Sequence, residues 1–152
     1  MILLRKCLPW FGLAALIVLT FTLRCWNWEQ IFVGNEIHFV DADCYSRMTR
    51  VQEVAVTPWR PIRFHDFENA PQGVIPHTTA PMDLSIVALA RLFGFCFSPS
   101  AFSPSALDLA GAFISPLLGV LLMGFLWWWS RALPWRNALL LVGAISPILV
   151  HG

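Results

Sequence analysis

Three apolar runs and one long polar stretch alternate along this chain. Residues 8–23 are apolar apart from two threonines, residues 107–129 form a second run, and a third begins at residue 137. A helix needs about 20 mostly apolar residues to cross the hydrocarbon core of a bilayer. The pattern therefore predicts three membrane spans, at 8–23, 107–129 and 137–152, of which the third is cut short.

The polar positions gather between the first two apolar runs. Eight of the nine acidic residues and three of the four histidines lie within residues 24–106. Within this stretch, residues 40–56 have apolar side chains at helical spacing. Asp41 suits the N-cap of that helix, and the prolines that begin at Pro58 end it. The apolar positions of the predicted helix are Val40, Cys44, Met48, Val51 and Ala55.

The apolar segment at residues 83–97 is short for a span. If it crossed the membrane, Arg131 and Arg136 would lie on the side opposite to Arg5 and Lys6. Basic residues are enriched on the cytoplasmic side of membrane proteins. We therefore expect this segment to lie on the outer surface as an interfacial helix.

These segments predict an all-α integral membrane protein with its N-terminus in the cytoplasm. Residues 24–106 form a large extracytoplasmic loop, and residues 130–136 form a cytoplasmic one. The bulky residues after the first run include no small-x-small cleavage site, so the first span is expected to stay uncleaved. We expect this membrane to be a bacterial or archaeal inner membrane or the endoplasmic reticulum.

Composition agrees with a membrane protein and excludes one class of partner. Hydrophobic residues make up 57% of the chain and charged residues 12%, whereas roughly a quarter of a soluble domain is charged. With a net charge of +1 and a single lysine, the chain offers no basic face for nucleic acid. Membrane lipid is an expected partner of the chain.

Two carboxylates, Asp41 and Asp43, lie at the start of the predicted helix. Mg²⁺ and Mn²⁺ prefer carboxylate oxygens, often together with a phosphate of the substrate. The alternative is helix capping, because acidic side chains are also favoured at a helix N-terminus. Arg47 and Arg50, one turn further along, either balance their charge or bind a phosphate.

The loop between the predicted helix and the interfacial segment is rich in groups that bind polar or anionic ligands. His65, Asp66 and His77 are its candidate substrate-binding residues. The alternative is a structural role, in which these side chains fix the loop through hydrogen bonds to its backbone.

Four short motifs follow one another in a definite order: Asp43-Cys-Tyr45-Ser-Arg47, then residues 64–73, then Thr79-Ala-Pro81-Met-Asp83, and finally Ile145-Ser-Pro147. This order resembles the N-terminal region of the oligosaccharyltransferase catalytic subunit family, in the GT-C class of membrane glycosyltransferases. In that family a first span precedes a large external loop with an Asp-x-Tyr signature, here Asp43 to Tyr45.

The resemblance implies a lipid-linked sugar donor, a protein acceptor, and a divalent cation, Mn²⁺ or Mg²⁺, held by acidic residues from several loops. Asp43 matches the first-loop acid of the family and would be a catalytic residue and metal ligand. Asp41 would be an additional metal ligand, although it has no firm counterpart in the family.

The resemblance also implies a function: transfer of glycan from a polyprenyl or dolichyl (pyro)phosphate carrier to a protein. The later motifs of the family would lie beyond residue 152. We therefore expect this chain to be inactive without the remainder of the polypeptide or other subunits. One alternative is another GT-C enzyme that uses a polyprenyl-phosphate sugar, with Asp43 as general base. The other is a small non-enzymatic membrane protein whose loop docks partners.

Overall fold

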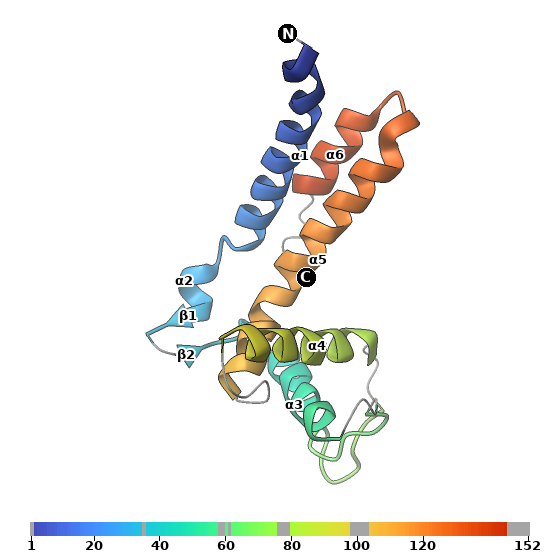
Figure 1. Ribbon diagram of the computed structural model, residues 1–152. Coiled ribbons are helices and arrows are strands. Elements are labelled where there is room, and N and C mark those ends of the chain that lie inside the picture. The colour runs from blue at the N-terminus through green and yellow to red at the C-terminus, as the bar shows by residue number, and fades with distance from the viewer. Residues whose placement is uncertain are drawn as a thin grey trace. The chain divides into compact units, whose positions relative to one another are not determined.

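The protein is mostly helical (Figure 1). This computed structural model describes residues 2–34, 36–57, 60, 62–75, 80–97 and 104–145. The predicted helical class is confirmed at this level, with a two-stranded hairpin in addition. The elements in chain order are α1 (Ile2–Arg24), α2 (Trp28–Ile31), β1 (Phe32–Val33), β2 (Glu36–Ile37), α3 (Ala42–Val56), α4 (Ala80–Phe97), α5 (Pro104–Trp129), the 3₁₀ turn η1 (Ser130–Ala132) and α6 (Arg136–Ile145).

The chain divides into two compact units. Residues 1–29 and 115–152 form the first unit, and residues 30–114 form the second. The helix α5 contributes its first turns to the second unit and the rest to the first.

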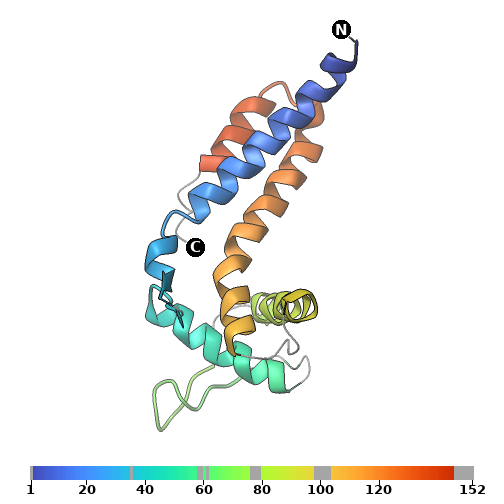
Figure 2. The same cartoon turned by 60° about the vertical axis from the view of Figure 1, so that its left-hand side comes forward.

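The first unit contains α1, α6 and most of α5, which lie side by side in both views (Figures 1 and 2). Its core is small and apolar because each helix turns aliphatic side chains toward the other two. The buried residues are Met123, Leu140 and Ala144, and partly buried Leu16, Ile17, Leu126 and Trp127 pack against them.

One helix in the described part of the chain, Ala106–Ala132, is long and apolar enough to cross a membrane, with a mean hydropathy of 2.2. It contains the predicted span 107–129. The first and third predicted spans are also helical, and their apolar described portions, Pro9–Arg24 and Arg136–Ile145, are shorter. Residues 146–152 of the third lie outside the described residues.

The second unit is built on α3, which packs against α4 and the first turns of α5. The buried core residues are Met48, Val51, Val54, Ala55, Ile86, Val87, Ala90, Leu107, Ala110 and Ile114. These residues recur at three- and four-residue intervals along each helix, so that each helix presents one apolar face. The predicted segment 83–97 is confirmed as helix, and α4 begins three residues earlier, at Ala80.

The predicted helix at 40–56 is confirmed from Ala42 to Val56. Val40, however, is 64% exposed, so its assignment to the apolar face was wrong. The reason lies in Asp41, whose extended backbone (φ −142°, ψ 168°) interrupts the helical spacing before the first turn.

A short antiparallel hairpin precedes α3. Phe32 pairs with Ile37 across its two strands, and Gly34 in the turn has φ +64°, a conformation that glycine adopts without strain. The ring of Phe32 lies 5.9 Å from that of Phe113, which packs the hairpin on α5 within the second unit.

Candidate functional site

Asp41 caps the helix α3. Its Oδ1 accepts a hydrogen bond of 2.7 Å from the backbone N–H of Cys44, as an N-cap residue does. This bond holds the pKa of the Asp41 carboxyl below its usual range, because it stabilises the charged form. The predicted capping role is therefore confirmed, and one carboxylate oxygen is already engaged.

The same turn makes the thiol of Cys44 a poor nucleophile. Burial, and next the neighbouring Asp41 carboxylate, raise the pKa of the Cys44 thiol to about 11. Cys44 is therefore largely protonated at neutral pH, and it reacts slowly because the thiolate is the reactive species. Both Cys44 and Cys25 are free thiols.

Tyr45 contacts the segment that precedes α3 and stabilises the start of the helix. The backbone N–H of Phe39 donates a hydrogen bond of 3.2 Å to the Tyr45 hydroxyl. The Phe39 and Tyr45 rings meet edge to face, with centroids 5.6 Å apart, which is an arrangement that aromatic pairs prefer. The first turn of α3 is thus held by a cap and by a side-chain tether.

Asp43 lies in this tethered first turn with its side chain exposed. Arg47, one turn along α3, is half-buried, and its charge also contributes to the lowered pKa of Asp41. The structure therefore brings Asp41, Asp43 and Arg47 together at one end of one helix. Asp43 is free to meet a ligand from solvent.

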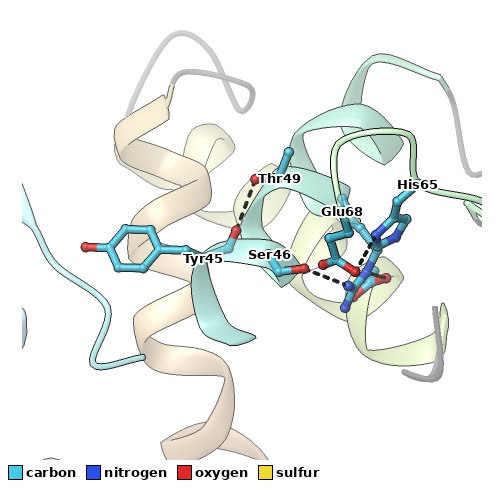
Figure 3. Close-up of polar contacts among 7 residues, drawn as sticks. Tyr45, Ser46, Thr49, His65 and Glu68 are labelled. Atoms are coloured by element: carbon cyan, nitrogen blue, oxygen red, sulfur yellow. Dashed lines mark hydrogen bonds and ion pairs between the residues drawn. The ribbon is translucent and has the colours of Figure 1, made fainter. Parts of the chain in front are cut away.

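A buried ion pair joins α3 to α4. Arg50 Nε lies 3.3 Å from Asp83 Oδ2, and the two side chains are only 4% and 6% exposed. Arg50 Nη1 also donates to the Ser46 hydroxyl at 3.4 Å (Figure 3). Within the described residues, Arg50 Nη2 and Asp83 Oδ1 have no hydrogen-bond partner. A buried charge costs a great deal unless it is paired, so the two residues depend on each other.

His65 is buried at the base of the loop that follows α3. Its backbone N–H and C=O both pair with Val74 at 2.8 Å, and its ring stacks on Phe67 with centroids 4.8 Å apart. His65 Nδ1 lies 3.3 Å from Glu68 Oε2 (Figure 3). His65 therefore anchors the loop through its backbone pairing with Val74 and through its stacked ring. The structural alternative expected side-chain hydrogen bonds to the loop backbone, and His65 makes none among the described residues, because neither of its ring nitrogens has a hydrogen-bond partner.

The other loop candidates differ in their surroundings. Asp66 is exposed beside the buried His65, where it is open to a ligand. His77 lies outside the described residues. The substrate-binding roles of Arg47, His65, Asp66 and His77 stay predictions.

A divalent cation needs more ligands than this helix end provides. No cluster of three or more His, Cys, Asp or Glu side chains that could hold a metal occurs in the described part of the chain. Asp41 is engaged as a cap, which leaves Asp43 as the one carboxylate of the pair with both oxygens available. The described residues alone therefore do not fit a complete metal site.

An open groove of about 500 Å³ runs along the second half of α3. It is lined by Thr49, Gln52, Glu53, Val56, Thr57 and Ile62. None of the predicted site residues lines it, so the groove and the Asp43 turn are separate features of α3.

The Arg50–Asp83 pair is the feature that sequence reasoning missed. The expectation that Arg50 balances the acidic pair or binds a phosphate was wrong, because the buried Arg50 side chain pairs with Asp83. One signal was available, because Arg50 and Asp83 lie four residues before the apolar Val54 and Val87, each on the face that its helix buries. A charge on a buried helix face needs a partner on the facing helix.

No protein-family model, curated protein or solved structure matches this chain. The candidate site is therefore defined by its own geometry. That geometry consists of an exposed carboxylate on a fixed helix turn, a neighbouring arginine, and a loop anchored by a buried histidine.

Proposed function

We propose that this chain is the N-terminal membrane region of an oligosaccharyltransferase-like GT-C glycosyltransferase. The enzyme moves glycan from a polyprenyl or dolichyl (pyro)phosphate carrier to a protein acceptor. The observation that supports this most is the exposed carboxylate of Asp43 in the first turn of α3. It follows an apolar helix, and Tyr45 completes the Asp-x-Tyr motif beside it.

The proposal includes a membrane topology. The helices α1, α5 and α6 cross the membrane, the N-terminus and the turn at residues 130–136 are cytoplasmic, and residues 24–106 are outside. The helix α4 lies on the outer surface. Its exposed Leu92 and Phe95, at 56% and 91%, favour contact with the apolar part of the membrane boundary.

In this proposal Asp43 supplies one carboxylate to Mn²⁺ or Mg²⁺. The remaining ligands come from elsewhere in the enzyme, since the described residues provide no further cluster. When bound, such a cation neutralises charge on a phosphate leaving group. The contribution of this chain is to hold the Asp43 carboxylate in place through the Asp41 cap and the Tyr45 tether.

The decisive experiment replaces Asp43 by Asn in the complete enzyme. Glycan transfer from a lipid-linked donor to an acceptor peptide is measured in membranes, with the protein level and helix content checked in parallel. We expect transfer to fall about 10²-fold or more, since the change removes a charge needed in the transition state. Glu53→Gln, an exposed carboxylate on the same helix, is the matched control and should leave transfer unchanged.

Two variants of Asp41 separate its two roles. Asn is as good an N-cap as Asp, whereas Ala costs about 1 kcal/mol of stability. If Asp41 only caps α3, Asp41→Asn keeps both stability and transfer. If it also binds metal, Asp41→Asn keeps stability and loses transfer.

The outcome that would contradict the proposal concerns Asp43. If Asp43→Asn transfers glycan at the wild-type rate, Asp43 has no metal-binding or catalytic role.

A further inference from the structure

Exposed tryptophans surround the turn that joins α5 to α6. Trp128, Trp129 and Trp135 are 60%, 54% and 53% exposed, and the ring of Phe125 lies 6.2 Å from that of Trp128. We call residues 125–136 the tryptophan turn. Exposed apolar patches mark contact surfaces, and tryptophan, with a polar N–H on an apolar ring, suits the boundary between lipid tails and water.

Two arginines lie within this turn. Arg131 is exposed, and the guanidinium carbon of Arg136 lies 3.9 Å from the centroid of the Trp127 ring. Stacking on a ring uses the flat face of a guanidinium and leaves the N–H groups on its edge to donate hydrogen bonds to the oxygens of a phosphate. Trp127 therefore fixes Arg136 in an orientation that favours an oxyanion.

The charge of the whole unit points to an anionic partner. Residues 1–29 and 115–152 contain a single acidic residue, Glu29, and no acidic residue follows residue 108. The first turns of α1 lie at the same end of this unit as the tryptophan turn (Figures 1 and 2). The basic residues of the unit are Arg5, Lys6, Arg24, Arg131 and Arg136.

We propose that the tryptophan turn binds an anionic phospholipid. Arg131 and Arg136 bind its phosphate, and Trp128, Trp129 and Trp135 lie in the headgroup layer. Phospholipid fits better than a soluble anion because exposed rings and cations occur together at the end of a helix long enough to cross a membrane. The inference rests on the membrane insertion proposed above and not on glycosyl transfer.

The test uses the full chain purified in a neutral detergent. Short-chain phosphatidylglycerol is titrated while tryptophan fluorescence is followed, with phosphatidylcholine of the same chain length as the uncharged lipid and inorganic phosphate as the soluble anion. We expect phosphatidylglycerol to bind tighter than either. The double variant Arg131→Gln/Arg136→Gln should lose affinity for it about fivefold for each arginine removed.

Three further variants keep the result interpretable. Arg60→Gln/Arg63→Gln removes two exposed arginines of the second unit and should bind phosphatidylglycerol like the wild type. Arg131→Lys/Arg136→Lys keeps both charges but loses the stacked guanidinium of Arg136, so its affinity should lie between those of the wild type and of the double glutamine variant. An unchanged circular dichroism spectrum of the double glutamine variant excludes misfolding as the cause of its loss. Asp43→Asn should bind the lipid normally, so failure of the proposed enzyme leaves this result standing.

Three results would overturn the proposal. Equal affinity for phosphatidylglycerol and phosphatidylcholine would show that charge is not recognised. An equal loss in Arg60→Gln/Arg63→Gln would show that only the total charge matters. Inorganic phosphate that binds as tightly as the lipid would identify a soluble anion as the ligand.

Discussion

The buried Arg50–Asp83 pair provides the sharpest test of how the second unit is held together. Both side chains are nearly inaccessible, at 4% and 6% exposure, so removal of either leaves the other charge buried without its partner. Such a loss costs about 3–5 kcal/mol. We expect Arg50→Met and Asp83→Val each to destabilise the protein by about this amount. An exposed ion pair would contribute less than about 1 kcal/mol.

The double variant carries the decisive information. Replacing both members of a buried pair by apolar residues is often neutral or stabilising, by about 1–4 kcal/mol. Arg50→Met/Asp83→Val should therefore be more stable than either single variant. The free energies come from reversible denaturation by SDS in mixed micelles, followed by circular dichroism, with Arg60→Gln as the exposed control.

The reasoning fails if the single variants each cost less than about 1 kcal/mol, which is the range of a solvated pair. It also fails if the double variant costs as much as the two single variants together. Additivity of that kind would mean that the two side chains stabilise the fold independently.

Further predictions concern the first turn of α3 and two glycines. Gly73→Ala should destabilise the protein by more than about 1–2 kcal/mol, the cost of a left-handed conformation for a residue other than glycine. Gly73 has φ +68°, and the new Cβ would in addition lie 2.5 Å from the His65 carbonyl oxygen. Proteolysis within residues 62–75 should accelerate. Gly34→Ala, at φ +64° with no atom within 4 Å, should show the conformational cost alone. Iodoacetamide should alkylate Cys44 about tenfold faster per pH unit up to pH about 11, and Asp41→Asn should raise the rate at pH 8. Since the pKa of Asp41 is lowered on folding, its cap stabilises α3 fully above pH about 4, and acid titration followed by circular dichroism should show that contribution lost as the pH falls through the folded pKa.

Helices were the part of the fold that local pattern could predict. The apolar periodicity of α3 and the cap at Asp41 determine where that helix begins, and the residues from Thr57 onward end it. The hairpin at Phe32–Ile37 was not predicted, because two-residue strands are too short to show an alternating pattern. The apolar pattern also does not decide which runs cross a membrane, since Ala106–Ala132 is the one helix among the described residues that is both long and apolar enough.

The candidate site was predicted in part for a related reason. The positions of Asp41 and Asp43 follow from local capping preferences, which act within four residues. The Arg50–Asp83 pair joins residues 33 positions apart, and it exists only once α3 has packed on α4. The burial of His65 likewise depends on the closure of a loop on Val74, which spacing along the chain does not reveal.

The two tethers at the start of α3 affect how tightly this turn can hold a ligand. Because the Asp41 cap and the bond from Phe39 N–H to the Tyr45 hydroxyl order the backbone before any ligand arrives, binding at Asp43 restricts only the torsions of one side chain. That restriction costs about 0.5–1.5 kcal/mol. Ordering a mobile loop would cost about 1–2 kcal/mol for every residue fixed. A turn held in advance would therefore let a ligand at Asp43 retain more of the binding energy of that contact.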